Sequence, residues 1–358
     1  MSEINTPDEL QYKIKSDQAI EKLHWKNQTL SDKDLAYARL DQCRFEQCQF
    51  NKTDWRFSQF EHTVFINCQF KQADLEECNF VECEFIQCQL VECDLGQSQW
   101  QGGRLQQSTF DRCVLSNGSF YQVDWAYSQL NQCQLEFASL FANQLHQAQF
   151  NQCQLNRLSI FDTLLSPMPF HDCALNQLML SNCQLQQLDL SQRDLSMTQF
   201  LGCDFSGTLF NQGNLTQTNF TDSTATNCQF KGITATGALF ASVDLSGSDF
   251  TGALLDKSSF QEANLTQCQL KQCNLEMAQL TDVQANHCHF DGSNMTYCDL
   301  SNANLSQAVL AGCELHSCNL HNVTEEDTDW YKANRDEALG TDEKRLNAQQ
   351  WQKPAAKG

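Results

Sequence analysis

The stretch Ala73–Leu95 reads ADLEECNFVECEFIQCQLVECDL and repeats with a period of five residues. Every fifth residue is large and apolar, and the residue two places before it is small. An α-helix repeats every 3.6 residues and a β-strand every two, so this period fits neither element and indicates a repeat architecture. The large residues are Leu75, Phe80, Phe85, Leu90 and Leu95, and the small ones are Ala73, Cys78, Cys83, Cys88 and Cys93.

The two inward positions predict how one unit is built. In an extended chain, residues two apart point to the same side, so the small and the large residue both face inward. The other residues of the unit then face water or turn a corner. Such a unit buries its inward pair only by stacking on further coils, and the register holds without a slip from Leu30 to Leu320, which gives about 59 units. We therefore expect an all-β solenoid with no large excursions.

All twenty cysteines have residue numbers that end in 3 or 8, which is the inward small position. Cysteine packs as a small buried apolar residue, and many thiols can persist together in a reducing compartment. His287 and His289 flank Cys288, but Cys288 should point inward and His289 outward, so this group does not predict a metal site. We expect structural cysteines, and neither a metal nor a cofactor.

The composition is acidic, with 44 Asp and Glu residues against 23 Lys and Arg residues. This balance argues against direct binding of nucleic acid. There is no run of 18 apolar residues, and the start MSEINTPDEL resembles no signal peptide. The expectation is a cytoplasmic protein without a membrane segment.

Five segments follow from where the period begins, weakens and ends. Residues 1–27 should form an N-terminal capping helix segment, residues 28–157 and 194–322 two halves of the solenoid, and residues 323–358 a C-terminal helical cap or dimerisation segment. Between the halves, residues 158–193 carry large residues at small positions, and Pro167 and Pro169 remove backbone donors. This segment predicts a kink, a loop or a wider core, with a binding site as the alternative.

Helix signals are found at both ends of the chain. Thr6 is a candidate N-cap before Pro7, which predicts a helix from residue 7 to about 23. Thr324 precedes Glu325, Glu326 and Asp327, which predicts a second helix start, with a stop near Leu339–Gly340. A further helix is expected from Thr341 to about Gln352, with Leu346 and Trp351. These C-terminal helices would cover the last coil or join two copies in a homodimer.

The pattern resembles the pentapeptide-repeat family, on the evidence of ADL at Ala73 and ANL at Ala263 and Ala303. The resemblance implies a right-handed quadrilateral parallel β-helix with four units in each coil. The sequence agrees with a 20-residue coil, since cysteines recur at that interval. They are Cys93, Cys113, Cys133, Cys153 and Cys173.

The sequence contains no Gly-rich phosphate loop, GxSxG or HExxH motif, and the predicted interior is filled, so we expect a protein without enzyme activity. Resemblance to the Qnr and MfpA group of the family implies that the protein binds DNA gyrase or topoisomerase IV as an acidic DNA mimic, modulating the topoisomerase or protecting it from quinolones. The alternative is a rigid scaffold or adaptor for protein partners, with no topoisomerase role.

Two surfaces are candidates for partner contacts. The first, the aspartate row, consists of Asp34, Asp54, Asp74 and Asp94 with Glu76 and Glu77. Its aspartates could equally follow the repeat consensus and keep the protein in solution. The second, the aromatic strip, consists of Tyr121, Phe141 and Phe161, with Leu201 two coils further on. Exposed apolar strips often mark interfaces, although corner aromatics can also stack to protect the backbone.

Overall fold

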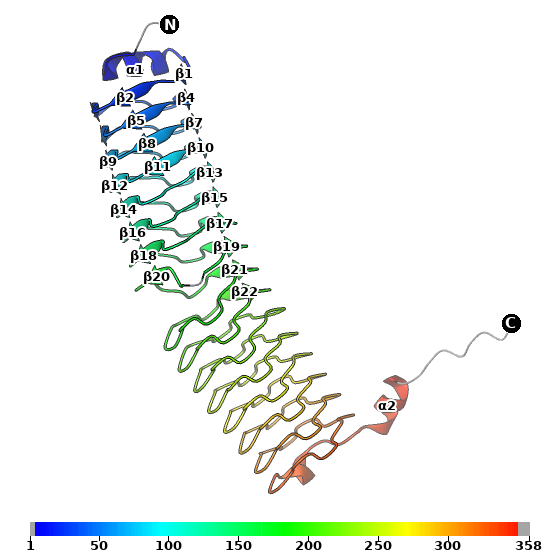
Figure 1. Ribbon diagram of the computed structural model, residues 1–358. Helices are drawn as coiled ribbons and strands as arrows, with labels where there is room; N and C mark the ends of the chain where they lie inside the picture. Colours follow the sequence, from blue (N-terminus) through cyan, green and yellow to red (C-terminus); the bar gives the residue numbers. More distant parts are fainter. Residues whose placement is uncertain (1–3, 166, 350–358) are drawn as a thin grey trace, which may run out of the picture. The chain divides into compact units, whose positions relative to one another are not determined.

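The structure is a computed structural model that describes residues 4–165 and 167–349. It is a parallel β-solenoid of stacked coils, with little helix in its described part (Figure 1). The chain divides into two compact units, residues 1–184 and 185–358, and each is described here by itself. The boundary falls inside the segment 158–193. Whether that segment forms a kink stays a prediction.

The first unit contains three parallel sheets, one on each of three sides of the coil. The first sheet contains, in hydrogen-bonded order, β1 (Ile20–Glu21), β4 (Arg39–Asp41), β7 (Gln59–Glu61), β10 (Asn79–Val81), β13 (Gln99–Gln101), β15 (Ser119–Tyr121), β17 (Ser139–Phe141), β19 (Ser159–Phe161) and β21 (Met179–Ser181). The second contains β2 (His24–Lys26), β5 (Arg44–Glu46), β8 (Val64–Ile66) and β11 (Glu84–Ile86). The third contains β3 (Thr29–Ser31), β6 (Gln49–Asn51), β9 (Gln69–Lys71), β12 (Gln89–Val91), β14 (Thr109–Asp111), β16 (Gln129–Asn131), β18 (Gln149–Asn151) and β20 (Phe170–His171).

Each coil takes twenty residues, as the recurrence of cysteines predicts. Leu40 pairs with Phe60 and Leu90 with Phe110 in parallel register. The fourth side of the coil pairs through single bridges, such as Asp34 with Asp54. In the second unit, β22 (Gln199–Leu201) is a named strand, and single bridges of the same spacing connect the coils. Four five-residue units therefore make one coil.

Aromatic ladders and thiols fill the core. Phe60 and Phe80 stack with ring centroids 4.9 Å apart, and so do Phe240 and Phe260 in the second unit. All twenty cysteines are buried and none forms a disulfide, which confirms the packing role. Many of these thiols donate to the carbonyl 23 residues earlier, as Cys68 does to Phe45 O at 3.4 Å. The thiol thus fills space and also satisfies a buried acceptor.

The corner of each unit requires a left-handed backbone at the second residue after the large one. Phe57 has φ of 60° there, and Ser58 N–H donates to Trp55 O at 3.1 Å, which closes a type II turn. Glycine suits this position, as at Gly207 with φ of 73°, and it is frequent there in the second unit. In the first unit other residues, such as Gln42 and Gln47, adopt the same left-handed conformation at this corner.

The helix α1 (Pro7–Lys15) is shorter than predicted. Thr6 is the N-cap of this helix, as expected. The Thr6 N–H donates to Glu9 Oε2 at 3.1 Å, which completes a capping box. The helix ends at Lys15 instead of residue 23, because Ile20 is already a large inward residue and pairs with Leu40. The strands thus begin before the predicted start of the solenoid at residue 28.

The predicted helix start at Thr324 is wrong. Leu305 N–H donates to Thr324 O at 2.7 Å, and Leu310 N–H donates to Asp329 O at 2.8 Å, so the coil continues through this segment. The preceding coil presents N–H groups that need acceptors, and this ladder outweighs the local helix signal. Glu325 therefore occupies a large position and is exposed.

The 3-10 helix η1 (Arg335–Glu337) lies within the last described coil, since Leu320 N–H donates to Leu339 O at 2.8 Å beyond it, and α2 (Glu343–Gln349) follows that coil. Buried His321 holds α2, since its Nδ1 accepts from the Asp342 N–H at 3.1 Å and its Nε2 lies 3.0 Å from Gln349 Oε1. No residue of α2 is buried. The predicted end of this helix near Trp351 and Gln352 lies outside the described residues.

The segment 158–193 buries the leucines at its small positions, although Leu164 and Met179 are exposed. Leu158, Leu178 and Leu188 are buried at small positions. Pro169 has no N–H, but its carbonyl accepts from Phe150 N–H at 2.8 Å, so the ladder persists on that side.

Among the described residues, no helix is long and apolar enough to cross a membrane.

Candidate interaction surfaces

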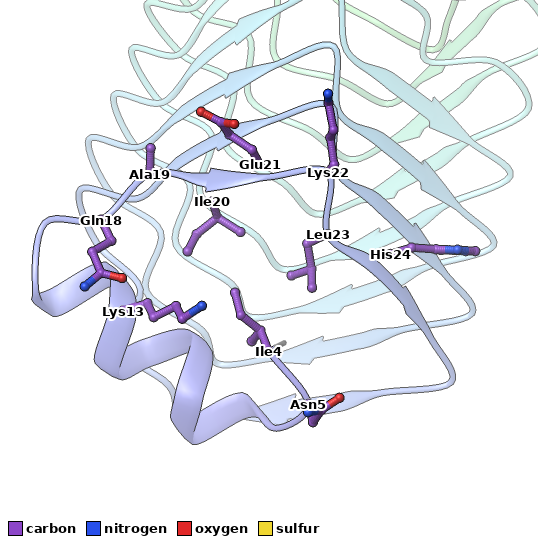
Figure 2. Close-up of a pocket in the computed structure, with 10 residues that line it drawn as sticks. All are labelled: Ile4, Asn5, Lys13, Gln18, Ala19, Ile20, Glu21, Lys22, Leu23 and His24. Atoms are coloured by element: carbon purple, nitrogen blue, oxygen red, sulfur yellow. The ribbon is translucent and has the colours of Figure 1, made fainter. Parts of the chain in front are cut away.

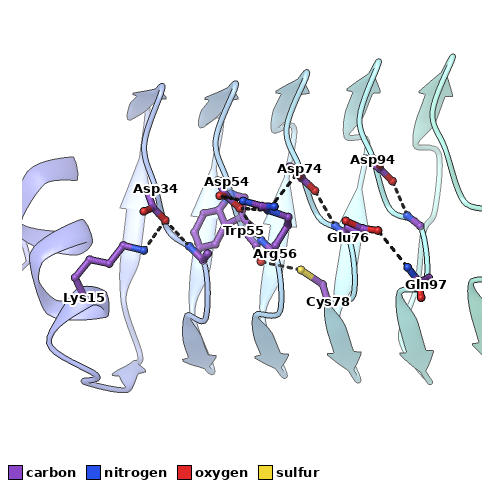
Figure 3. Close-up of polar contacts among 12 residues, drawn as sticks. Lys15, Asp34, Asp54, Trp55, Arg56, Asp74, Glu76, Cys78, Asp94 and Gln97 are labelled. Carbon is purple, nitrogen blue, oxygen red and sulfur yellow. Dashed lines mark hydrogen bonds and ion pairs between the residues drawn. The ribbon is translucent and has the colours of Figure 1, made fainter.

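The aspartate row is continuous in the first unit. Asp34, Asp54, Asp74 and Asp94 bridge in sequence on successive coils, as Figure 3 shows. Their carboxylates lie on one side of the coil at the spacing of stacked strands, about 4.8 Å. The predicted alignment of these residues is therefore present.

Each aspartate of the row also holds its own turn. Asp54 Oδ1 accepts from the Arg56 N–H at 3.1 Å, and Asp94 Oδ1 accepts from the Gly96 N–H at 2.8 Å. Asn214 makes the same contact with the Thr216 N–H at 3.1 Å in the second unit. Either aspartate or asparagine can occupy this position, because the side chain of each supplies the acceptor that the turn needs. This is a structural reason for the row.

Basic groups neutralise part of the row. Lys15 pairs with Asp34, and Arg56 lies 2.8 Å from Asp54 and 3.3 Å from Asp74. Hydrogen bonding to Arg56 lowers the pKa of Asp54, whereas burial raises the pKa of Asp74. The row therefore carries less net charge than its four aspartate carboxylates suggest.

The two glutamates that were grouped with the row differ in their contacts. Glu76 Oε1 accepts from Gln97 Nε2 at 3.1 Å, which links two coils. Glu77 is exposed at the left-handed corner position, with φ of 54°. Glu77 thus presents its carboxylate to solvent more freely than Glu76 does.

The aromatic strip forms on the first sheet. Tyr121, Phe141 and Phe161 end β15, β17 and β19, and the strands pair so that the three side chains are in register. The Tyr121 and Phe141 rings stack with centroids 5.3 Å apart, and the Phe141 and Phe161 centroids are 6.2 Å apart. Tyr121 is 41% exposed and Phe141 39%, so stacking leaves much of each ring open to water. Leu201 ends β22 in the second unit and is 37% exposed.

A surface cavity adjoins the strip. It has a volume of about 360 Å³, and Tyr121 is one of its lining residues together with Trp100 and Ser119. Gln99 and Gln101 add amide groups to its wall. An aromatic ladder beside a partly polar hollow offers both apolar contact and hydrogen bonds to a partner.

A second cavity of about 490 Å³ lies at the N-terminal end, between α1 and the first coil (Figure 2). Ile4, Ile20 and Leu23 provide its apolar wall, and Lys13 and His24 are among its polar lining residues. The sequence did not predict this hollow, because residues 18–23, which line it, were expected to belong to the helix.

The metal-binding possibility around Cys288 has the geometry expected from the sequence. Cys288 is fully buried, whereas His289 points outward and its Nδ1 lies 3.2 Å from Asp291 Oδ2.

A different group of donors was not identified from the sequence. Oxygens of Asp41 and Glu61 and a ring nitrogen of His62 lie within 4.8 Å of one another. The signal in the sequence is an acidic pair twenty residues apart with a histidine beside it.

Comparison with known families identifies the repeat. A family described as pentapeptide repeat region matches residues 63–140 and 263–329, and one described as pentapeptide repeats (8 copies) matches residues 43–81, 198–234 and 238–276. The chain belongs to the pentapeptide-repeat family. A search of curated proteins gave no match.

Solved structures of pentapeptide-repeat proteins resemble this chain. Full-length QnrB1, a plasmid-mediated fluoroquinolone resistance protein, is 18% identical over 55% of this chain and 96% of its own, with a TM-score of 0.29. HetL of the cyanobacterium Nostoc, involved in heterocyst differentiation regulation, is 18% identical over 95% of this chain and 98% of its own, with a TM-score of 0.16. At these TM-scores the likeness carries no information about partners.

Proposed function

We propose that this pentapeptide-repeat protein is a non-enzymatic scaffold that binds a protein partner through the aromatic strip. The observation that carries the proposal is the in-register stack of Tyr121 and Phe141, which leaves both rings substantially exposed. A rigid ladder holds these rings in place before binding, so little side-chain entropy is lost when a partner covers them. Aromatic residues are enriched at the centres of protein interfaces.

A double variant tests the scaffold proposal. Replacing Phe141→Ser and Phe161→Ser should weaken binding to a co-purified partner or self-association, and should leave the circular dichroism spectrum unchanged. The matched control is Phe57→Ser, because Phe57 and Tyr37 form another exposed stack, with centroids 5.0 Å apart. Unchanged sedimentation and pull-down profiles for the double variant would count against the aromatic strip.

The second candidate is a DNA mimic that binds DNA gyrase or topoisomerase IV, the enzymes that the Qnr resemblance suggests. The unbroken row of stacked aspartates supports it. One carboxylate for about every 4.8 Å is dilute beside duplex DNA, which carries one charge per roughly 1.7 Å. Neutralisation by Arg56 and Lys15 weakens the mimicry further. We therefore rank this candidate below the scaffold.

A supercoiling assay tests the mimic. Purified protein should inhibit gyrase or protect it from a quinolone, and the effect should decrease as salt rises. Asp54→Asn, Asp74→Asn and Asp94→Asn together should weaken it, while asparagine keeps the turn acceptor. Asp244→Asn is the control, since Asp244 holds the same turn through the Ser246 N–H at 3.1 Å. Equal activity of mutant and wild type at every salt concentration would remove this candidate.

Two further parts of the proposal concern environment and assembly. Twenty buried cysteines without disulfides suit the reducing cytoplasm.

The last coil presents an edge and the half-buried Trp330, which supports contact with a second copy at the C-terminal end. Sedimentation of the full chain across a concentration series tests this dimer, and a single monomeric species throughout would exclude it.

A further inference from the structure

Register brings two carboxylates together at one corner of the first sheet. Asp41 ends β4 and Glu61 ends β7, and the two residues are parallel partners. Their side chains leave neighbouring coils on the same side, at the strand spacing of about 4.8 Å. Arg39, on the same strand as Asp41, donates instead to Asp17 at 2.9 Å. Within the described residues, no lysine or arginine forms an ion pair with Asp41 or Glu61.

His62 adds a nitrogen donor to this pair. Its backbone is fixed at the corner, because its N–H donates to Val81 O at 2.9 Å and its φ is 46°. Its Nδ1 lies 3.3 Å from Asp41 Oδ1. One donor atom from each of Asp41, Glu61 and His62 lies within 4.8 Å of the other two. The coil therefore holds three ligand atoms of two chemical kinds close together.

We propose that Asp41, Glu61 and His62 bind one divalent metal ion of the zinc, nickel or cobalt class. These ions accept imidazole nitrogen and carboxylate oxygen at about 2.0–2.2 Å, so ligands bound to one ion stand roughly 3–3.5 Å apart. The 3.3 Å between His62 and Asp41 already meets this separation. Small rotations of the Glu61 side chain bring in the third ligand, and water completes the coordination.

The electrostatic setting favours a cation at this corner. Glu21 pairs with Asp41 on the preceding coil and adds a third acidic residue to this ladder, after Asp41 and Glu61. Gln42 Nε2 reaches Asp41 Oδ2 at 3.4 Å and would compete only weakly for that oxygen. Binding the ion relieves repulsion between the stacked carboxylates.

Calorimetric titration of the full chain with ZnCl₂ and NiCl₂ tests the site. We expect one ion for each chain, with binding weakened at least tenfold by His62→Ala and by Glu61→Gln. The matched control is His289→Ala, because His289 lies 3.2 Å from Asp291 but belongs to no group of three donors. This control should bind as the wild type does. No binding at millimolar metal, or equal binding by His62→Ala and wild type, overturns the proposal.

Cobalt distinguishes this site from the cysteines. Because the twenty thiols are buried, Co²⁺ bound at Asp41, Glu61 and His62 should show no thiolate charge-transfer absorption. Such absorption at one equivalent of Co²⁺ would instead assign the binding to cysteine and contradict the proposal. Near-ultraviolet circular dichroism should stay unchanged during the titration.

Discussion

The Arg56 guanidinium donates to the Asp54 carboxylate at 2.8 Å, which pairs two residues of a single corner. The Arg56 side chain is 43% exposed and that of Asp54 28%, so solvent screens the pair. The aspartate row, which the sequence indicates as a negatively charged surface, thus consists partly of turn acceptors and ion-paired carboxylates. Stability and partner binding should therefore respond differently to substitution there.

Asp54→Asn should lower the free energy of unfolding by about 0.2–1 kcal/mol at pH 7, the range for a solvent-screened ion pair. The pKa of Asp54 is lowered by Arg56, so its stabilisation is present above the unfolded value of about 3.9 and is lost as pH falls through the folded value. Urea unfolding should show the gap between variant and wild type closing at acid pH. A gap that persists at pH 2 would contradict the ion-pair account.

The Cys43 and Cys83 thiols should be unreactive in the native protein. Burial raises the pKa of Cys83 to about 12 and that of Cys43 to about 11. Little thiolate then exists at pH 8, so alkylation should be slow until urea unfolds the chain. Mass spectrometry of the labelled peptides measures this, and rapid native labelling of Cys83 would refute it. Because an unfolded thiol titrates near 8.5, stability should also fall as pH rises from about 8.5 towards these values.

Gly103→Ala should be strongly destabilising. A Cβ at Gly103 would lie 2.0 Å from Cys83 O, and φ there is 81°. We expect a loss of more than about 2 kcal/mol from steric overlap and backbone strain. Thermal melting compares this variant with Gly340→Ala, where a Cβ meets nothing within 4 Å. Similar melting temperatures for the two variants would show that the backbone adapts at Gly103.

Two truncations separate the last coil from α2. Deleting residues 324–358 removes the acceptors Thr324 O and Asp329 O and uncovers Leu305 and Leu310, so we expect aggregation or a changed oligomeric state. Deleting residues 341–358 leaves that ladder in place and should keep the protein in solution, because no residue of α2 is buried. Light scattering and sedimentation compare the two. A 324–358 deletion with native mass and melting behaviour would be contrary to this expectation.

The sequence alone determined the repeat and the inward positions, and its cysteine spacing agreed with the twenty-residue coil that the family resemblance implies. Each unit repeats the same requirement, a small residue two places before a large one. The pattern therefore persists at an exception such as Ala225, a small residue at a large position that is still fully buried. The inward cysteines followed from counting, and the alignment of Asp34 with Asp54 followed from the four-unit coil that the family resemblance implies. The aromatic strip followed in the same way, because side chains twenty residues apart stack.

Only the tertiary structure decided what depends on the neighbouring coil. The residues from Thr324 onward have a local helix signal. The segment forms another coil instead, because its carbonyls accept hydrogen bonds from the N–H groups of Leu305 and Leu310. Likewise, α1 ends at Lys15, because Ile20 already pairs with Leu40 in the first sheet. The neutralisation of Asp54 by Arg56 and the meeting of Asp41, Glu61 and His62 depend on side-chain directions at the corners. A period specifies which residues stack, whereas contacts between stacked coils determine their charge and chemistry.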